Sequence, residues 1–349
     1  MRCAVTGGAG FIGSNLVRMM LDHGHHVFNL DALTYAGNLH SLNDVALHPH
    51  YRFEQIDLVQ SPKLFELLQD FQPDCVVHLA AESHVDRSID APGQFVQTNV
   101  VGTYQLLQAS TQYWRSLPRA SQDTFRFLHV STDEVFGSLG NEGFFTESTA
   151  YDPRSPYSAS KAASDHLVRA WFHTYGLPTL VTNCSNNYGP YQFPEKFIPV
   201  VLLKCLRQEP IPVYGKGDNI RDWLYVHDHC TALEIVLQRG RVGETYAIGG
   251  NNEMRNIDLA TKLCRIMDHL HPPTIVKRHE DLLTFVTDRP GHDLRYAIDA
   301  TKLREELGWQ PNTDHDKLLR QTAQWYLENP KWWTDILSGS YRLDRLGLP

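Results

Sequence analysis

The chain has 349 residues, of which 42% are hydrophobic and 21% charged, a balance typical of a globular protein with a substantial core. Its formal net charge is −8 and its 32 Lys and Arg residues are scattered, so no basic patch predicts a nucleic-acid partner. No apolar run is long enough to cross a bilayer, and an apolar strand follows Met1 directly, so we expect no membrane anchor, no signal peptide and a cytoplasmic location.

A strand, a glycine-rich turn and a helix open the chain. The apolar run 2–6 is followed by glycines at positions 7, 8, 10 and 13, and then by a helical apolar pattern that ends near Gly24. Such glycines permit a tight turn and let backbone N–H groups at the helix N-terminus approach a pyrophosphate. We therefore predict that a dinucleotide binds here, and the residues assigned to it are Gly7, Gly10, Phe11, Ile12 and Gly13.

A carboxylate ends the second predicted strand, residues 26–30. Asp31 lies about 20 residues after the glycines, where a carboxylate binds ribose hydroxyls and repels a ribose phosphate, so we predict NAD rather than NADP. The other interpretation is that Asp31 caps the turn after it. We assign Ala32, Leu33 and Thr34 to the same site, and Asp57 and Leu58, after a strand at 53–56, to the adenine.

Alternating strands and helices continue to about residue 183. A strand at 73–79 ends at Leu79 and opens into Ala80 and Ala81, whose small side chains leave space for a cofactor, and we assign all three residues to the cofactor. A long helix from about Asn99 to Trp114 precedes a strand at 125–130. This alternation predicts an α/β fold, a Rossmann-type doubly wound parallel sheet with ligands at the carboxyl ends of its strands.

The most informative residues follow the strand at 125–130. Thr132, Asp133 and Glu134 place a hydroxyl and two carboxylates at a strand exit, and Tyr157 and Lys161 follow at a spacing that puts both on one helix face. A phenol beside an ammonium is more easily ionised and can take a proton from an alcohol. A Tyr and a Lys at this spacing are more often a solvated face, but the preceding hydroxyl and the dinucleotide fingerprint favour the oxidation of a secondary alcohol.

The composition changes beyond Cys184. Residues 186–196 are rich in turn formers, amides and aromatics, a helix is predicted at 197–207, a strand at 211–214, and residues 221–226 return toward the sheet. We predict an NAD-binding domain at 1–185 with returning segments near 220–250, and a smaller, mainly substrate-binding domain at 186–349. Two amphipathic helices, around 303–307 and 318–326, are expected to cover this smaller domain.

The six cysteines stand singly and without a CxxC pair, so we interpret them as free thiols of a reducing compartment. The segment His227-Asp228-His229 resembles a ligand cluster, but no further Cys or His at ligand spacing stands near it. We therefore predict no metal site.

Eight segments carry a family resemblance over essentially the whole chain: TGGAGFIGSN, LDALTYAGN, HLAAESHVDRS, VSTDEVFG, SPYSASKA, NNYGPYQFPEKFIP, GDNIRDWLYVHDH and DRPGHDLRYAID. With these the chain resembles the extended short-chain dehydrogenases/reductases, and among them the dTDP-glucose 4,6-dehydratases. The resemblance gives most weight to Asp133, because related decarboxylases and GDP-mannose dehydratases place Ser there and 4-epimerases lack the acidic pair.

The resemblance implies a hydro-lyase that converts dTDP-glucose to dTDP-4-keto-6-deoxyglucose while NAD stays bound and is regenerated. Tyr157 then takes the proton of the carbon 4 hydroxyl, with its pKa lowered by Lys161 and the nicotinamide, and Thr132 hydrogen-bonds the same oxygen. Glu134 removes the carbon 5 proton and Asp133 protonates the hydroxyl that leaves carbon 6.

The resemblance also implies the remaining contacts and a homodimer through the helices of Asn99 and Tyr157. Ser83, Thr98 and Asn187, with Tyr157 and Lys161, are placed on the cofactor side. The expected substrate contacts are Ser83, His84, Thr132, Asn186, Lys196, Phe197, Pro212, Val213, Tyr214, Arg221, Asn256, Asp288, Arg289 and His292.

Two alternatives stay open at this point. One is another sugar-nucleotide dehydratase, epimerase or decarboxylase of the superfamily, and the other is a catalytically silent NAD-binding regulator. Residue chemistry does not separate a dTDP from a UDP carrier, and the charged, glycine-bearing segment 138–148 is expected to alter the lid over the sugar.

Overall fold

The structure is a computed structural model that describes residues 1–288 and 291–338. Its centre is a seven-stranded sheet in the order β10-β6-β5-β4-β1-β2-β3, and every neighbouring pair is parallel. The predicted doubly wound α/β fold is confirmed. The strands are β1 (Arg2–Thr6), β2 (His26–Asp31), β3 (Tyr51–Gln55), β4 (Cys75–His78), β5 (Arg126–Thr132), β6 (Thr179–Cys184) and β10 (Thr245–Ile248).

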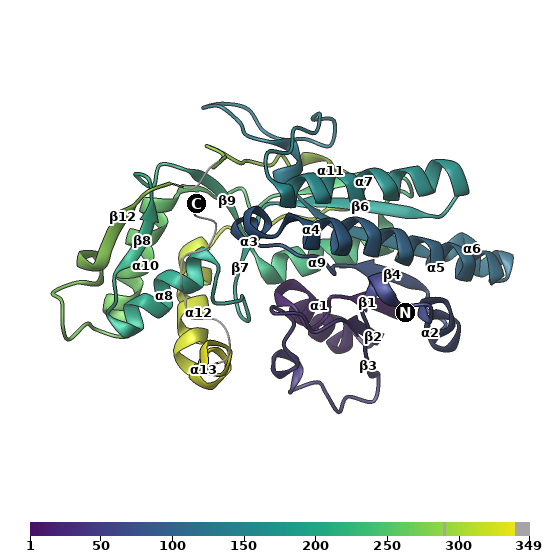
Figure 1. Cartoon of the computed structure of the whole chain (residues 1–349), viewed down its shortest axis with the longest axis horizontal. Coiled ribbons are helices and arrows are strands. Elements are labelled where there is room, and N and C mark those ends of the chain that lie inside the picture. The colour runs from purple at the N-terminus through teal and green to yellow at the C-terminus, as the bar shows by residue number, and fades with distance from the viewer. Residues whose placement is uncertain (289–290, 339–349) are drawn as a thin grey trace.

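Helices cover both faces of this sheet (Figure 1). Side chains alternate along each strand: Cys3 and Val5 of β1 enter one apolar cluster, whereas Ala4 enters the cluster on the opposite face. The first cluster packs under α1 (Phe11–Asp22), α9 (Val226–Arg239) and α11 (Thr301–Leu307), and the second under α2 (Leu64–Phe71), α5 (Thr103–Ser116) and α7 (Pro156–Tyr175). Shorter elements between them are η1 (Leu39–Leu42), η2 (Leu58–Gln60), α3 (Val85–Asp90), α4 (Pro92–Phe95), α6 (Arg119–Thr124) and η4 (Asp133–Phe136).

The long helix expected from Asn99 differs from the prediction at its start. Residues Val96–Gly102 form a π-helix, η3, which continues as α5. Asn99 lies inside η3, where its side-chain amide accepts a hydrogen bond from Glu82 N (2.8 Å) and donates one to Glu82 O (3.0 Å). The widened turn therefore coincides with a side chain that holds the loop after β4.

The remainder of the described chain forms a smaller body with its own apolar cluster. A three-stranded sheet, in the order β11-β9-β7, and a parallel pair, β12 with β8, support its helices. Its elements are β7 (Asn186–Tyr188), α8 (Phe197–Arg207), β8 (Ile211–Tyr214), β9 (Ile220–Tyr225), β11 (Glu253–Arg255), α10 (Asn256–Leu270), η5 (His279–Leu282), β12 (Leu283–Val286), α12 (His315–Glu328) and α13 (Pro330–Ser338).

The two helices expected to cover this body pack in different apolar clusters. Leu318 and Leu319 of α12 pack into the smaller cluster, as predicted. Leu303 and Leu307 of α11 instead pack on the main sheet beside β10 and α9, so the prediction for the first helix is wrong. The short apolar pattern of α11 fits either cluster, and only the path of the chain after β10 decides between them.

Among residues 1–288 and 291–338, no helix is both long and apolar enough to cross a membrane. The six cysteines are free and buried, and the Sγ atoms of Cys205 and Cys264 are 4.0 Å apart.

Candidate active site

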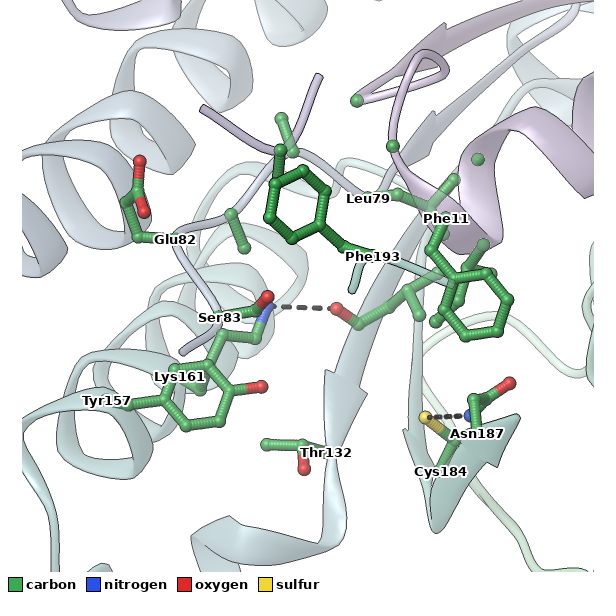
Figure 2. Close-up of a pocket in the computed structure, with 18 of the residues that line it drawn as sticks. Phe11, Leu79, Glu82, Ser83, Thr132, Tyr157, Lys161, Cys184, Asn187 and Phe193 are labelled. Atoms are coloured by element: carbon green, nitrogen blue, oxygen red, sulfur yellow. Dashed lines mark hydrogen bonds between the residues drawn. The ribbon is translucent and has the colours of Figure 1, made fainter. Parts of the chain in front are cut away.

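A deep cavity lies at the carboxyl ends of β1, β4, β5 and β6, where it is lined by side chains from both bodies (Figure 2). It brings together residues that the sequence predicted separately, from the glycine turn to the Tyr and Lys of α7. The predicted residues that line it are Gly7, Gly10, Phe11, Ile12, Gly13, Asp31, Ala32, Thr34, Leu79, Ala80, Ala81, Ser83, Thr98, Thr132, Asp133, Glu134, Tyr157, Lys161, Asn186, Asn187 and Lys196.

Two positions of the turn, residues 7 and 13, have no room for any side chain and require glycine. Gly7 has a φ of +73°, and a Cβ there would lie 2.6 Å from Ala80 N. A Cβ on Gly13 would lie 2.1 Å from Gly7 O, inside the turn itself. The turn thus presents the N-terminus of α1 to the cavity, where the first helical N–H groups have no intrahelical partner and the helix dipole favours an anion.

Asp31 organises the edge of the cavity beside this turn. One carboxylate oxygen accepts a hydrogen bond from Ala9 N (2.9 Å), and the other accepts one from Leu33 N (2.8 Å). Burial raises the pKa of Asp31, and these two hydrogen bonds act in the opposite direction. Its carboxylate therefore also caps the turn after β2, as the second interpretation of this residue expected.

Thr132 ends β5 and caps the short helix η4. Its Oγ1 accepts a hydrogen bond from Glu134 N (3.3 Å) and donates one to Asp133 Oδ1 (3.2 Å), and its carbonyl accepts one from Asn183 Nδ2 (3.0 Å). The hydroxyl therefore turns the chain so that two adjacent carboxylates lie at the cavity wall.

Asp133 is 2% exposed, and its Oδ2 has no hydrogen-bond partner among the described residues. Burial raises the pKa of Asp133 well above its usual value, and the nearby Glu134 and Asp222 carboxylates raise it further, whereas Arg221 lowers it. These surroundings favour the protonated carboxyl, which is the form that can donate a proton.

Tyr157 and Lys161 lie on the first two turns of α7. A capping box between Ser155 and Ser158 starts this helix, and the two predicted side chains, 8% and 4% exposed, reach the cavity from one face. Figure 2 shows the Tyr157 hydroxyl on the same side of the cavity as Thr132. The Lys161 ammonium donates a hydrogen bond to the Val130 carbonyl at 2.9 Å.

The electrostatics of Tyr157 differ from the expectation. Burial raises the pKa of the phenol well above its usual value, Glu134 raises it further, and a hydrogen bond with Thr132 lowers it. Lys161 is not among the largest causes of this shift, and its ammonium hydrogen-bonds a carbonyl. The lowering expected from Lys161 together with a bound nicotinamide stays a prediction.

Three predicted cofactor residues do not line this cavity. Leu33 has a φ of 54° and contributes its backbone N–H to Asp31. Asp57 is exposed and caps η2 through a hydrogen bond from Val59 N (2.9 Å), while Leu58 is buried against the sheet.

The predicted substrate residues outside the cavity form two groups near it. In the first, the Tyr214 hydroxyl donates to Asp86 (3.3 Å), the His292 ring stands at right angles to the Tyr214 ring, and His292 Nδ1 is 2.6 Å from Asp288 Oδ1. His84 caps α3 in the same neighbourhood.

The second group lies beside the carboxylates. Arg221 is 5% exposed, donates to the Asp293 carbonyl at 3.0 Å, and places its guanidinium 4.1 Å from the centre of the Tyr296 ring. Asn256 begins α10, and its N–H donates a hydrogen bond to the Asn219 carbonyl just before β9, the strand of Arg221, at 2.9 Å.

Of the other predicted substrate residues, the Phe197 ring stacks on Trp223, Val213 is fully buried and Pro212 is half-buried. Arg289 lies outside the described residues.

The histidines that resembled a metal cluster have other partners. The His229 ring nitrogen Nδ1 lies 2.9 Å from Asn187 Oδ1, and Asp228 accepts a hydrogen bond from Asn312 N (3.0 Å). In residues 1–288 and 291–338, no group of three or more His, Cys, Asp or Glu side chains is arranged to hold a metal ion.

Comparison with known proteins identifies the family of this chain. Residues 4–322 match a family model described as GDP-mannose 4,6 dehydratase. A dTDP-glucose 4,6-dehydratase of Neisseria meningitidis is 57% identical over 98% of both chains. The chain belongs to the dTDP-glucose 4,6-dehydratase family.

Solved structures agree with this membership of the dTDP-glucose 4,6-dehydratase family. The Streptomyces venezuelae enzyme of that name, solved with NAD bound, has a TM-score of 0.87 and 43% identity over 96% of this chain and 100% of its own. A Thermus thermophilus UDP-glucose 4-epimerase, also in complex with NAD, has a TM-score of 0.82 but only 25% identity over 94% of this chain and 100% of its own.

The sequence reasoning missed several residues that line the cavity in this dehydratase-family chain. Glu82, Gln192, Phe193 and Glu195 stood inside the motifs HLAAESHVDRS and NNYGPYQFPEKFIP but were not selected, although buried carboxylates in such motifs were a usable signal. The full set of missed lining residues is Ala36, Gly37, Glu82, Val130, Ser131, Cys184, Ser185, Gln192, Phe193 and Glu195.

Glu195 joins three chain segments at the cavity. Its carboxylate accepts a hydrogen bond from the Tyr35 hydroxyl (2.9 Å) and lies 3.4 Å from Arg87 Nε, while the Arg87 guanidinium lies 3.7 Å from the centre of the Tyr35 ring. Beside it, Lys196 Nζ donates to the Ser83 carbonyl at 3.0 Å. The segments after β2, β4 and β7 are thereby connected across the cavity.

Proposed function

We propose that the protein is a hydro-lyase that dehydrates dTDP-glucose to dTDP-4-keto-6-deoxyglucose with NAD as its resident hydride carrier. One observation carries the proposal: the buried carboxyl of Asp133 lines the same cavity as Glu134, Tyr157 and the glycine turn. An alcohol oxidation alone needs no such acid beside a second carboxylate, whereas the elimination of water needs both.

The cavity residues fit NAD. The N-terminus of α1 offers unpaired N–H groups to a pyrophosphate, the Gly13 position leaves no room for a Cβ, and Asp31 places a carboxylate at the ribose end. When bound there, NAD accepts the hydride from carbon 4 of the sugar and returns it to carbon 6. We assign the cofactor side to the glycine turn, Asp31 and the predicted residues that surround them.

In the first stage the chain moves one proton. Tyr157 takes the proton of the carbon 4 hydroxyl, and Thr132 hydrogen-bonds the same oxygen. Lys161 supplies a positive charge one turn away, so that a phenolate becomes accessible at the position where burial alone disfavours it. The resulting ketone acidifies the proton on carbon 5.

In the second stage the two carboxyl groups divide the work. Glu134 removes the carbon 5 proton as a base, and Asp133 donates its proton to the hydroxyl that leaves carbon 6. The raised pKa of Asp133, caused first by burial and then by Glu134, suits a group that must hold a proton until this step. Reprotonation at carbon 5 completes the product.

We assign the nucleotide half of the substrate to the residues beyond the carboxylates. Arg221 has a buried guanidinium, Asn256 begins α10, and Tyr214 ends β8. Planar cations and amide donors suit a pyrophosphate and a base. The division into an NAD-binding part at 1–185, with returning segments near 220–250, and a substrate part at 186–349 is proposed on the same basis.

Isotope incorporation tests this function. The purified protein, given dTDP-glucose in deuterated water without added NAD, is expected to yield a 4-keto-6-deoxy product that carries deuterium at carbon 5, detected by mass and proton spectra. UDP-glucose in a parallel reaction tests the carrier. The absence of product even with added NAD, together with demonstrated NAD binding, would overturn the proposal in favour of a silent NAD-binding protein.

We further propose a homodimer through the outer faces of η3, α5 and α7. Val96, Tyr104 and Tyr175 on these neighbouring elements are 49%, 38% and 43% exposed, which is unusual for large apolar and aromatic side chains. Sedimentation is expected to give a dimer that Tyr104→Glu converts to a monomer. The six free, buried cysteines support a cytoplasmic location.

A further inference from the structure

Asp165 is a fully buried carboxylate on α7, one helical turn after Lys161. Its Oδ1 lies 3.1 Å from His129 Nε2, and its Oδ2 accepts hydrogen bonds from the Tyr151 hydroxyl (2.8 Å) and Asn183 Nδ2 (3.2 Å). The site described above does not use it.

The hydrogen-bond donors to Asp165 are neutral. Burial lowers the pKa of His129 to about 4 and raises the pKa of Tyr151 well above neutrality, and Asn183 carries no charge. Burial by itself raises the pKa of Asp165. The hydrogen bond and charge interaction with His129, then the charge of Lys161 and a hydrogen bond from Ser131, outweigh burial and leave the pKa below its usual value. A buried anion therefore lies among neutral donors, and it needs a cation.

Two cations on the same helix face flank this anion. Lys161 precedes Asp165 by one turn, and Arg169 follows it by one turn and donates to the Tyr151 hydroxyl at 2.9 Å. Lys161 is itself 4% exposed, and its hydrogen bond goes to the uncharged carbonyl of Val130. Burial lowers the pKa of Lys161, and Asp165 raises it again.

The remaining titratable groups around the pair do not supply charge. His78 faces it from β4 with a pKa lowered by burial, and Cys184 faces it from β6 with a pKa raised by burial. With His129 from β5 and Tyr151 from the segment before α7, the surroundings of the pair are neutral apart from Arg169.

The same carboxylate connects the two halves of the catalytic set. Asp165 belongs to α7, which carries Tyr157, whereas His129 belongs to β5, which ends at Thr132. Asn183 bridges the two elements, because its amide donates to Asp165 and to the Thr132 carbonyl.

We propose that Asp165 is a positioning residue of the reaction: it is the buried counterion of the Lys161 ammonium, and it fixes the helix of Tyr157 to the strand that ends at Thr132. This inference rests on the proposed function for its kinetic consequence. Its electrostatic part does not depend on which substrate the protein uses.

The first test compares Asp165→Asn with Tyr151→Phe. Both remove a hydrogen bond at the same site, but only the first removes the charge. The measurement is the pH dependence of NADH formation on the enzyme, followed by near-ultraviolet absorbance in single turnovers. In Asp165→Asn we expect the alkaline limb of this profile to move down by about one pH unit, because Lys161 loses its proton more readily. KM is expected to stay within about twofold, and Tyr151→Phe is expected to keep the wild-type limb. An Asp165→Asn rate reduced equally at every pH would overturn the counterion role.

The second test needs no substrate. Lys161→Met leaves a buried anion without its cation, and Asp165→Asn leaves a buried cation without its anion, so each single variant is expected to unfold at a lower temperature than wild type. The double variant Lys161→Met/Asp165→Asn is expected to unfold at a higher temperature than Lys161→Met alone, since it removes both charges. Losses that simply add in the double variant would contradict the pairing, even if the dehydratase assignment stood.

Discussion

The Thr132 hydroxyl donates a hydrogen bond to Oδ1 of Asp133 at 3.2 Å, whereas Oδ2 of the same carboxyl has no hydrogen-bond partner in the part of the chain that the structure describes. A carboxyl satisfied on one oxygen and buried on the other favours the protonated form. One oxygen is thus oriented by Thr132, and the other is left to carry the proton that the proposed mechanism requires.

Asp133→Asn is expected to separate oxidation from elimination. The amide keeps the shape of the side chain but cannot transfer a proton, so loss of water should slow by about 10²- to 10⁴-fold while the oxidation at carbon 4 changes little. Rapid mixing should show NADH that accumulates and persists on the enzyme. Unchanged elimination would show that Asp133 is not the acid. Glu134→Gln is the matched control, because it should also abolish deuterium exchange at carbon 5.

The same variant is expected to stabilise the fold at neutral pH. The pKa of Asp133 is higher in the folded state than in the unfolded state, so the folded state binds more protons. Stability therefore falls as the pH rises from the unfolded pKa toward the folded pKa. Replacing the group with a neutral amide should raise the free energy of unfolding by roughly 1–3 kcal/mol near pH 7. The gain should vanish at about pH 3, where the carboxyl is protonated in both the folded and the unfolded state. Thermal unfolding at the two pH values measures it, and an equal shift at both would refute the electrostatic origin.

Tyr157→Phe is expected to stop the reaction at its first stage. Without the phenol oxygen the proposed acceptor for the proton of the sugar hydroxyl is lost, so NADH formation in a single turnover should fall by about 10²-fold or more. Burial of the ring is unchanged by the substitution, so the melting temperature and NAD content should match those of wild type. A variant that still forms NADH at the wild-type rate would assign the base elsewhere.

Glu195→Gln is expected to accelerate the loss of NAD. The substitution weakens the contacts that join Tyr35, Arg87 and the segment after β7 across the cavity. We expect NAD to dissociate about tenfold faster, in line with the loss of a charge-assisted contact of 1–2 kcal/mol. Release into an excess of a competing NAD-binding protein measures the rate. Glu209→Gln, which breaks the half-exposed pair with Lys204, is the control and should leave the rate unchanged.

Gly13→Ala is expected to abolish NAD binding. Its Cβ would lie 2.1 Å from Gly7 O, so the turn has to open and the α1 N-terminus moves away from the pyrophosphate site. Gly93→Ala is the control, because a Cβ at Gly93 meets nothing within 4 Å. Cofactor content after purification distinguishes the two. Normal NAD content in Gly13→Ala would mean that the turn is not the cofactor cradle.

The sheet was predictable from the sequence because its strands are buried on both faces. The apolar runs of β4, β5 and β6 are bounded by turn residues and separated by helical patterns, and that alternation permits few topologies. In the smaller body, β7 and β11 have three residues each, which is too short for an alternating pattern to be recognised in the sequence. Their pairing with β9 follows from tertiary packing that no local pattern records.

The site was predictable where it is contiguous. Thr132, Asp133 and Glu134 are neighbours, and Tyr157 and Lys161 share a helix face, so spacing alone relates them. Tyr35 and Glu195 are 160 residues apart, and their hydrogen bond exists only because the segment after β7 folds back over the loop after β2. The raised pKa of Tyr157 was likewise out of reach, since it depends on burial by residues from several elements.

The seventh strand of the main sheet, β10, follows three strands and a helix of the smaller body in the chain, and it pairs with β6 through Thr245↔Val181 and the residues after it. During synthesis the outer edge of β6 therefore stays unpaired until this first part of the smaller body has left the ribosome. Long-range pairing of this kind slows folding, because the chain closes a large loop before the contact is gained. The main sheet is thus complete only after the first strands and helix of the smaller body have been made, and truncations before β10 should aggregate rather than fold.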